Sequence, residues 1–119
     1  PSVKKFAPVK FPMGGAVRLC PSAETMGIAE GIETAMAAMI LNDIPVWAAL
    51  TAGAMVKWEP PQTAKSIVVY ADADRSFTGQ ASAFALAHRL KNEGYNVDVH
   101  VPAELDIDWN DVLLAERVA

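Results

Sequence analysis

The chain alternates between short runs of apolar residues and longer stretches with a helical repeat. Four apolar runs predict strands, and a fifth strand is predicted where valines alternate with polar residues. The strands are expected at Ala16–Leu19, Met26–Ala29, Val46–Leu50, Ile67–Ala71 and Val97–Val101. The run over 67–71 is continuous and rich in β-branched residues, which is typical of a strand buried on both faces.

The stretches between these runs predict helices. Residues 32, 35, 36, 39 and 40 are apolar and fall at positions i, i+3, i+4, i+7 and i+8, so a helix is expected with Met36, Met39 and Ile40 in the core. Asn42 and Pro45 end it. A second stripe at 83, 86, 87 and 90 predicts a long helix that stops at Gly94, and residues 108–116 predict a short closing helix. The segment between the third and fourth predicted strands is expected to be a glycine-containing loop.

Alternation of strands and helices predicts an α/β domain with a mostly parallel sheet and helices on both faces. In such sheets, ligands bind beyond the carboxyl ends of the strands. Residues 1–13 contain three prolines and no sustained period, so they are expected to form an extended lead-in to a single domain at 14–119.

Acidic residues follow two of the predicted strands. Glu30 comes after the strand at 26–29, and Asp72 and Asp74 come after the strand at 67–71. In extended backbone, residues i and i+2 point the same way, so the two aspartates can present their carboxylates to one ion, with Glu30 from a neighbouring strand. Three carboxylates suit Mg²⁺ or Mn²⁺. The alternative is that both aspartates are ordinary turn and capping residues.

Two further groups of polar residues have both a functional and a structural interpretation. Arg75, Ser76 and Gly79 lie where the long helix begins and could cradle a phosphate, although Ser76 could simply cap that helix. Asp108 and Asp111 could belong to the acidic site, although their spacing also fits a helix-capping arrangement.

Charge is distributed unevenly and limits the partners that the chain can bind alone. Residues 1–20 hold four basic side chains and no acidic ones, whereas residues 21–119 hold six basic and 14 acidic side chains, a net charge of −8. This part repels phosphate backbones unless cations or a basic partner intervene.

The single cysteine excludes a zinc site built from a cysteine cluster. The longest apolar run is far shorter than the roughly 20 residues of a membrane span, and no signal peptide is evident, so a soluble, cytoplasmic protein without membrane contact is expected.

Taken together, the motifs resemble the Toprim domain, and in particular the primase-type Toprim modules of phage and plasmid replication proteins. The similar segments are GIAEGIETAMAA, PVWAALTAGAM, VVYADADRSFTGQASA and DWNDVL, in the order found in that family, over about residues 14–116. The resemblance implies a Rossmann-like α/β fold in which Glu30, Asp72 and Asp74 are catalytic and bind Mg²⁺ or Mn²⁺. Asp108 and Asp111 match the late acidic motif of the family less closely.

The resemblance also implies a reaction, which is nucleotidyl transfer from nucleoside triphosphates to make an RNA primer on single-stranded DNA. The chain contains no Cys/His cluster and no P-loop, so we expect a module that acts with neighbouring zinc-binding and helicase domains of a larger protein and is weak or inactive alone. Two alternatives remain. One is metal-dependent phosphoryl hydrolysis by a nuclease or a haloacid-dehalogenase-like phosphatase, whose nucleophile motif Asp72-x-Asp74 imitates. The other is a non-catalytic module that binds nucleotide or scaffolds an assembly.

Overall fold

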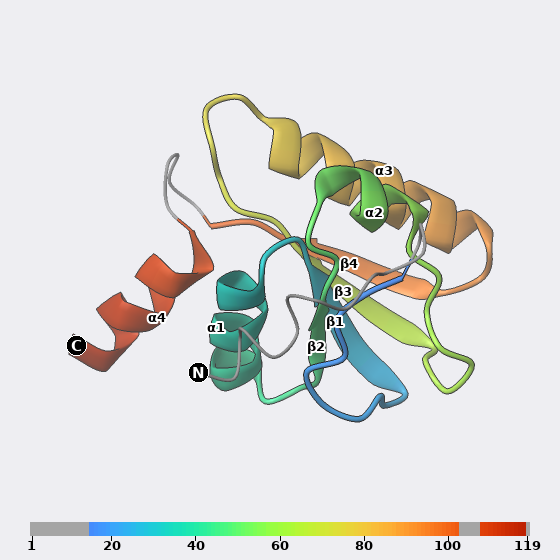
Figure 1. The fold of residues 1–119 in the computed structure, drawn as a ribbon, viewed down its shortest axis with the longest axis horizontal. Coiled ribbons are helices and arrows are strands. Elements are labelled where there is room, and N and C mark those ends of the chain that lie inside the picture. Colours follow the sequence, from blue (N-terminus) through green and yellow to red (C-terminus); the bar gives the residue numbers. More distant parts are fainter. Residues whose placement is uncertain (1–14, 103–107, 119) are drawn as a thin grey trace.

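The structure is a computed structural model and describes residues 15–102 and 108–118. Strands and helices alternate along the chain (Figure 1). The elements are β1 (Thr25–Ala29), α1 (Ile32–Asn42), β2 (Val46–Ala48), α2 (Ala52–Lys57), β3 (Ser66–Tyr70), α3 (Thr78–Asn92), β4 (Asn96–His100) and α4 (Trp109–Val118). The predicted α/β class is confirmed.

The four strands form one sheet in the order β2-β1-β3-β4, and every pair is parallel. The central strands β1 and β3 run in register from Thr25 opposite Ser66 to Ala29 opposite Tyr70. Parallel neighbours end at the same edge of a sheet, so the segments that follow β1 and β3 start next to each other. This topology places Glu30 and Asp72 at one edge.

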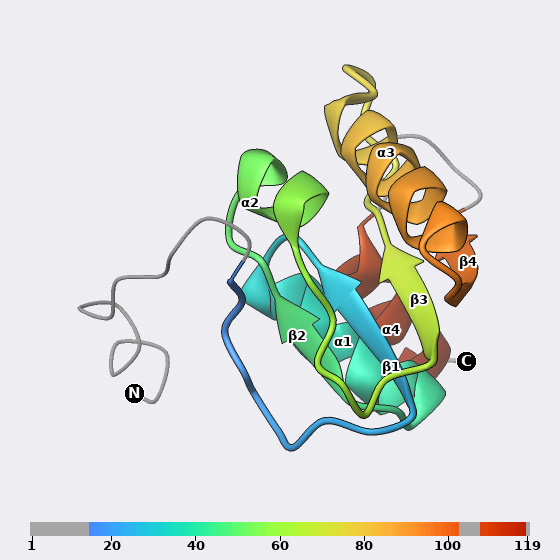
Figure 2. The same cartoon turned by 90° about the vertical axis from the view of Figure 1, so that its right-hand side faces the viewer.

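Helices cover both faces of the sheet, as predicted (Figure 2). On one face, α2 and α3 pack together over a core that includes Met26, Met55 and Leu86. On the other face, α1 packs against the sheet and against α4, over a core that includes Ala35 and Tyr70. Two separate apolar layers therefore hold the sheet and fix the edge that carries the acidic residues.

A close approach between β1 and β3 shapes the second core. A Cβ atom at Gly27 would lie 2.7 Å from Cε2 of Tyr70, so only glycine leaves room for this ring. The Tyr70 ring also meets the rings of His100 and Trp109 edge-on, at centroid distances of 5.6 and 5.3 Å. Tyr70 thus joins β1, β4 and α4 beneath the end of the sheet.

Two of the predicted strands are shorter than expected, and a predicted loop is a helix. The segment 16–19 contributes a single antiparallel bridge, between Val17 and Ala48, rather than a strand. β2 ends at Ala48 because the backbone turns at Leu50, where φ is 78°. The segment after it forms α2, whose N-cap Thr51 accepts a hydrogen bond from the Ala54 N–H at 3.0 Å. The capping threonine is the signal in the sequence that favours this helix.

The predicted buried face of α1 is wrong in part. Met36 and Ile40 are 46% and 56% exposed, whereas Thr34, Ala35, Ala37 and Ala38 are buried. Nearly every position of this helix is apolar, so the repeat did not define one face. Small side chains face the sheet because they let the helix axis approach it closely.

The remaining helices agree with the sequence. α3 buries Ala83, Leu86 and Leu90 and is followed by Gly94 at φ 103°, and α4 begins at Trp109. The lead-in predicted at 1–13 lies outside the described residues. Within 15–102 and 108–118, no helix is long and apolar enough to cross a membrane.

Candidate active site

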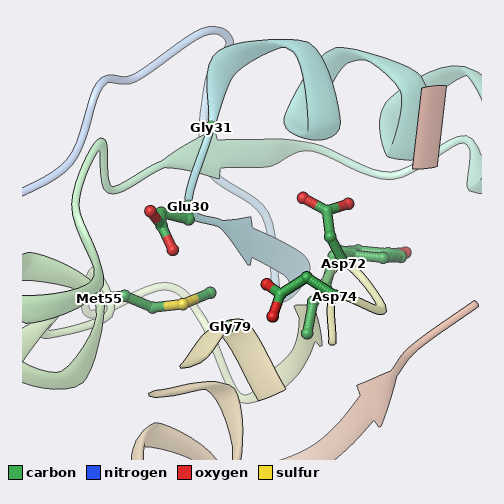
Figure 3. Close-up of a pocket in the computed structure, with 8 residues that line it drawn as sticks. Glu30, Gly31, Met55, Asp72, Asp74 and Gly79 are labelled. Atoms are coloured by element: carbon green, nitrogen blue, oxygen red, sulfur yellow. The ribbon is translucent and has the colours of Figure 1, made fainter. Parts of the chain in front are cut away.

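A pocket of about 220 Å³ opens at the carboxyl ends of β1 and β3 (Figure 3). Its lining comes from the segment after β1, from α2, from β3 with the loop that follows, and from the first turn of α3. The lining residues are Glu30, Gly31, Met55, Tyr70, Ala71, Asp72, Asp74 and Gly79. All three acidic residues predicted for the site therefore border one pocket.

Glu30 is the first residue after β1 and is partly buried. Its carbonyl accepts a hydrogen bond from the Leu50 N–H at 2.6 Å, which fixes the backbone where the chain leaves the strand. Burial, and then the negative charges of Asp72 and Asp74, raise the pKa of the Glu30 carboxyl. The three carboxyls are thus close enough to repel one another.

Asp72 is held by two helices on the α1/α4 face. Its Oδ2 accepts a hydrogen bond from Thr34 Oγ1 at 3.2 Å, and its Oδ1 accepts one from the Trp109 N–H, also at 3.2 Å. Burial, together with the negative charges of Asp108 and Asp74, nevertheless raises the pKa of Asp72 against the lowering effect of these two bonds. The two hydrogen bonds therefore fix the position of the Asp72 carboxyl but do not fully offset the cost of burying its negative charge.

Asp74 lies in the loop between β3 and α3, and its electrostatic environment shifts its pKa in the opposite direction. Ser76 Oγ donates a hydrogen bond to Oδ1 at 2.7 Å, and backbone N–H groups of Phe77, Gly79 and Ser76 also point at the carboxylate. The Ser76 hydroxyl, followed by these backbone donors, lowers the pKa of Asp74. This carboxylate therefore stays ionised over a wide pH range.

The two aspartates do not continue the strand as the i, i+2 argument assumed. β3 ends at Tyr70, and the carboxylates are anchored to different elements, Asp72 to α1 and α4 and Asp74 to the start of α3. Figure 3 shows the Glu30 and Asp74 carboxylates on either side of the pocket, with that of Asp72 turned toward α1. In the described part of the chain, no three acidic, histidine or cysteine side chains are grouped so as to hold one metal ion. The predicted ligand set therefore stays a prediction.

The chemistry of the pocket nevertheless suits a divalent cation. Carboxylate oxygens are hard donors, and Mg²⁺ needs only one or two of them because it keeps several of its waters. A cation between Glu30 and Asp74 would offset the negative charges of the aspartates, which after burial raise the pKa of Glu30. The residues present fit such an ion.

The predicted phosphate-binding residues lie at the rim of the pocket. The Ser76 hydroxyl donates a hydrogen bond to Asp74, and Gly79 lines the pocket. A Cβ atom at Gly79 would lie 3.4 Å from Oδ2 of Asp74. Arg75 is exposed in the same loop. The structure gives Ser76 the role of orienting Asp74, and phosphate binding by these three residues stays a prediction.

Asp108 and Asp111 bind each other's backbone at the start of α4. The Asp111 N–H donates to Asp108 Oδ1 at 2.8 Å, and the Asp108 N–H donates to Asp111 Oδ2 at 3.2 Å. These are the bonds of a capping box. Neither residue lines the pocket, although the charge of Asp108 contributes to the raised pKa of Asp72. Between them, Trp109 donates its indole N–H to the Ala71 carbonyl at 2.9 Å, which ties α4 to the end of β3.

Sequence reasoning missed three residues at the site. Thr34 is buried in α1 and reaches Asp72, and its signal was a hydroxyl on an otherwise apolar stretch. Met55 comes from α2, which was predicted to be a loop, and Tyr70 was treated only as part of a strand. Each of these depends on a packing arrangement between distant segments.

Comparison with known proteins identifies the family. A model of the Toprim domain matches residues 25–117, which is most of the chain and contains every predicted acidic residue of the site. The chain belongs to the Toprim domain family. This Toprim domain is also similar in fold to the crystal structure of a DNA primase domain from Pseudomonas aeruginosa, with a TM-score of 0.56 and 17% identity. The match covers 80% of this chain and 30% of that chain, so the Toprim domain corresponds to less than a third of the primase domain. No curated protein sequence matches it.

Proposed function

We propose that this Toprim domain is the catalytic module of a DNA primase-like replication protein and joins nucleotides on a single-stranded DNA template. The observation that carries the proposal is the single pocket bordered by Glu30, Asp72 and Asp74. Membership of the Toprim family supports a module that makes or breaks phosphodiester bonds, and the likeness to a primase domain supports the fold that such a module needs.

Glu30 and Asp74, with Asp72 beside them, would hold Mg²⁺ or Mn²⁺, which when bound lowers the pKa of the attacking hydroxyl and neutralises charge on the phosphoryl group. In the transfer, the 3′-oxygen of the growing strand forms a bond to the α-phosphorus of the nucleoside triphosphate as the bond to pyrophosphate breaks. The alternative role for Glu30 is that of general base: where the ion is held by the aspartates alone, the raised pKa of the Glu30 carboxyl suits it to accept the hydroxyl proton. Asp74 remains charged because Ser76 and three backbone N–H groups stabilise its ionised form.

Neighbouring domains would bind the template and help to bind the nucleotide. Residues 21–119 carry a net charge of −8, which opposes a polynucleotide backbone. The chain also spans only 30% of the primase domain that it resembles in fold. A zinc-binding region and a helicase in the same larger protein would supply the missing basic surface.

Metal binding is the first test. Calorimetric titration with Mn²⁺ should show saturable binding, which Asp74→Asn should weaken and the double variant Asp72→Asn/Asp74→Asn should abolish. Asp98→Asn is the matched control, because Asp98 is exposed on β4 and lies away from the pocket. Unchanged affinity in the double variant would overturn the metal site.

The products of the reaction separate the candidate functions. Incubation with nucleoside triphosphates, Mn²⁺ and single-stranded DNA should yield short oligonucleotides that depend on Glu30 and Asp74. Shortened DNA would instead indicate a nuclease, and release of inorganic phosphate would indicate a phosphatase. Because the domain is expected to be weak or inactive alone, the assay is repeated with its neighbouring domains present, and metal binding without any product there indicates a non-catalytic module.

A further inference from the structure

Phe77 has an unusual position in the loop between Asp74 and Gly79, two residues that line the acidic pocket. It directly precedes α3, and its side chain is 56% exposed. Its φ angle is 60°, in the left-handed region that favours glycine and disfavours bulky residues. Its N–H donates to the Asp74 carbonyl at 3.2 Å and also faces the Asp74 carboxylate. A residue in a costly backbone conformation, whose N–H faces Asp74, therefore exposes its phenyl ring to solvent.

The ring contributes nothing evident to the core. The buried side of α3 is formed by Ala83, Leu86 and Leu90, which pack on the sheet. A core role would turn the ring inward, and a purely structural turn at this φ would be better served by glycine. The position and exposure of Phe77 thus call for an external partner.

A second exposed phenylalanine lies within α3. Phe84 is 57% exposed and follows Phe77 by seven residues, which is two helical turns, or roughly 10 Å along the axis. Ala81, between them in the sequence, is exposed and small. Two accessible phenylalanine rings therefore belong to this segment, one directly before α3 and one within it.

We propose that Phe77 stacks on a nucleobase whose phosphate lies at the acidic pocket, and that Phe84 offers a second stacking surface further along α3. The inference rests on the proposed function, because it requires a nucleotide or strand at Glu30 and Asp74. Residues 21–119 carry excess negative charge, so the backbone of a strand provides little attraction here. Stacking on aromatic rings attracts bases of any sequence without using charge.

The test compares probes with and without bases. Binding of a short oligothymidylate and of an abasic oligomer of equal length is measured by fluorescence anisotropy in Mg²⁺, together with a nucleoside triphosphate and the corresponding base-free ribose triphosphate. The variants are Phe77→Ala, Phe77→Trp and, as the matched control, Met36→Ala, which removes a comparably exposed apolar side chain from α1.

Phe77→Ala should weaken binding of a base-containing probe by about five- to a hundredfold and leave its base-free counterpart unaffected. Phe77→Trp should restore affinity, and Met36→Ala should change nothing. A loss for oligothymidylate alone assigns the stacked base to the strand, and a loss for the nucleoside triphosphate alone assigns it to the incoming nucleotide. Equal losses for base-containing and base-free probes, no loss for either, or no saturable binding by the wild-type chain would overturn the proposal.

Phe77→Gly distinguishes stacking from a structural role. Glycine relieves the backbone conformation, so this variant should raise the melting temperature while losing affinity for the base-containing probe. A lower melting temperature would show that the ring stabilises the fold and would overturn the proposal. Mn²⁺ affinity should stay unchanged in every Phe77 variant. If Mn²⁺ binding depends on Asp74 but probe affinity is the same in the Phe77 variants as in the wild type, only the stacking proposal is wrong. If Mn²⁺ affinity is unchanged by substitution of Asp72 and Asp74, the proposed function itself is wrong.

Discussion

At the scale of single residues, Tyr70 links the core to the pocket. It is fully buried, lines the acidic pocket, and burial raises the pKa of its phenol to about 12, against 10.0 for an ordinary tyrosine. When the pKa of an acidic group is higher in the folded state than in the unfolded state, the free energy of unfolding falls as the pH rises from the lower pKa to the higher one.

This shift predicts an alkaline loss of stability. Above about pH 10, the unfolded chain releases the Tyr70 proton while the folded chain keeps it, so the free energy of unfolding should fall as the pH rises toward 12. Tyr70→Phe should make this fall less steep. Urea unfolding at several alkaline pH values measures the slope, with Tyr95→Phe as the control at a more exposed position. Equal slopes for Tyr70→Phe and wild type would contradict the prediction.

Gly27 provides a second prediction for a single residue. Gly27→Ala should destabilise the protein by roughly 1–3 kcal/mol because its Cβ would meet the buried ring of Tyr70 at 2.7 Å and Val46 Cγ2 at 3.1 Å. Gly53→Ala in α2 is the control. Its Cβ would meet nothing within 4 Å, so it should raise stability by up to about 1 kcal/mol. Chemical denaturation of both variants measures the difference, and a neutral Gly27→Ala would mean that the strands can separate at little cost.

At the scale of elements, α4 begins with the reciprocal bonds of Asp108 and Asp111 and is attached to the sheet through Trp109. Asp111→Ala should cost about 0.5–2 kcal/mol of stability, because it removes the acceptor for the Asp108 N–H and one end of the capping box. Thermal unfolding measures the loss, and Asn110→Ala, an exposed neighbour in the same turn, is the control.

The same variant tests the role in metal binding that the sequence predicted for the late acidic pair. If Asp111 only caps α4, Asp111→Ala should retain the Mn²⁺ affinity of the wild type. A weaker affinity with unchanged melting temperature would instead place Asp111 in the site.

The sequence predicted these elements well where a residue pattern has one structural meaning. The β-branched run at 67–71 and the stripe that ends at Gly94 correspond to β3 and α3. The pattern failed in α1, where apolar residues on every side leave the buried face undetermined, and in α2, where one capping threonine was the only signal. It predicted that Glu30, Asp72 and Asp74 lie together, because parallel neighbours end at one edge.

The orientation of the acidic side chains could not be predicted in the same way. It depends on Thr34 and the Trp109 N–H, which reach Asp72 from elements 38 and 37 residues away in the chain. The left-handed backbone at Phe77 is likewise fixed by the turn around Asp74 rather than by a residue preference. Local patterns carry no information about such contacts.

At the scale of the whole molecule, two apolar layers hold a thin sheet whose acidic end is open. Glu30 and Asp72 follow the two central strands, β1 and β3. Each of these is hydrogen-bonded to a neighbour on both sides, whereas β2 and β4 each have one neighbour in the sheet. All 14 acidic side chains lie outside the first 20 residues, and three of them border the pocket at this open end.

The central position of β1 and β3 has a consequence for exchange of backbone amide hydrogens with solvent. Edge strands open in local fluctuations, whereas central strands are exposed only when the whole domain unfolds. Amides of β1 and β3 should therefore exchange slowest in deuterium oxide, those of β4 sooner, and Mg²⁺ should slow the β1 and β3 amides because a ligand of the folded state stabilises it globally. Nuclear magnetic resonance can follow each amide, and β3 amides that exchange faster than those of β4 would contradict this order. The acidic pocket is thus expected to persist through partial opening of the protein and to disappear only with the fold itself.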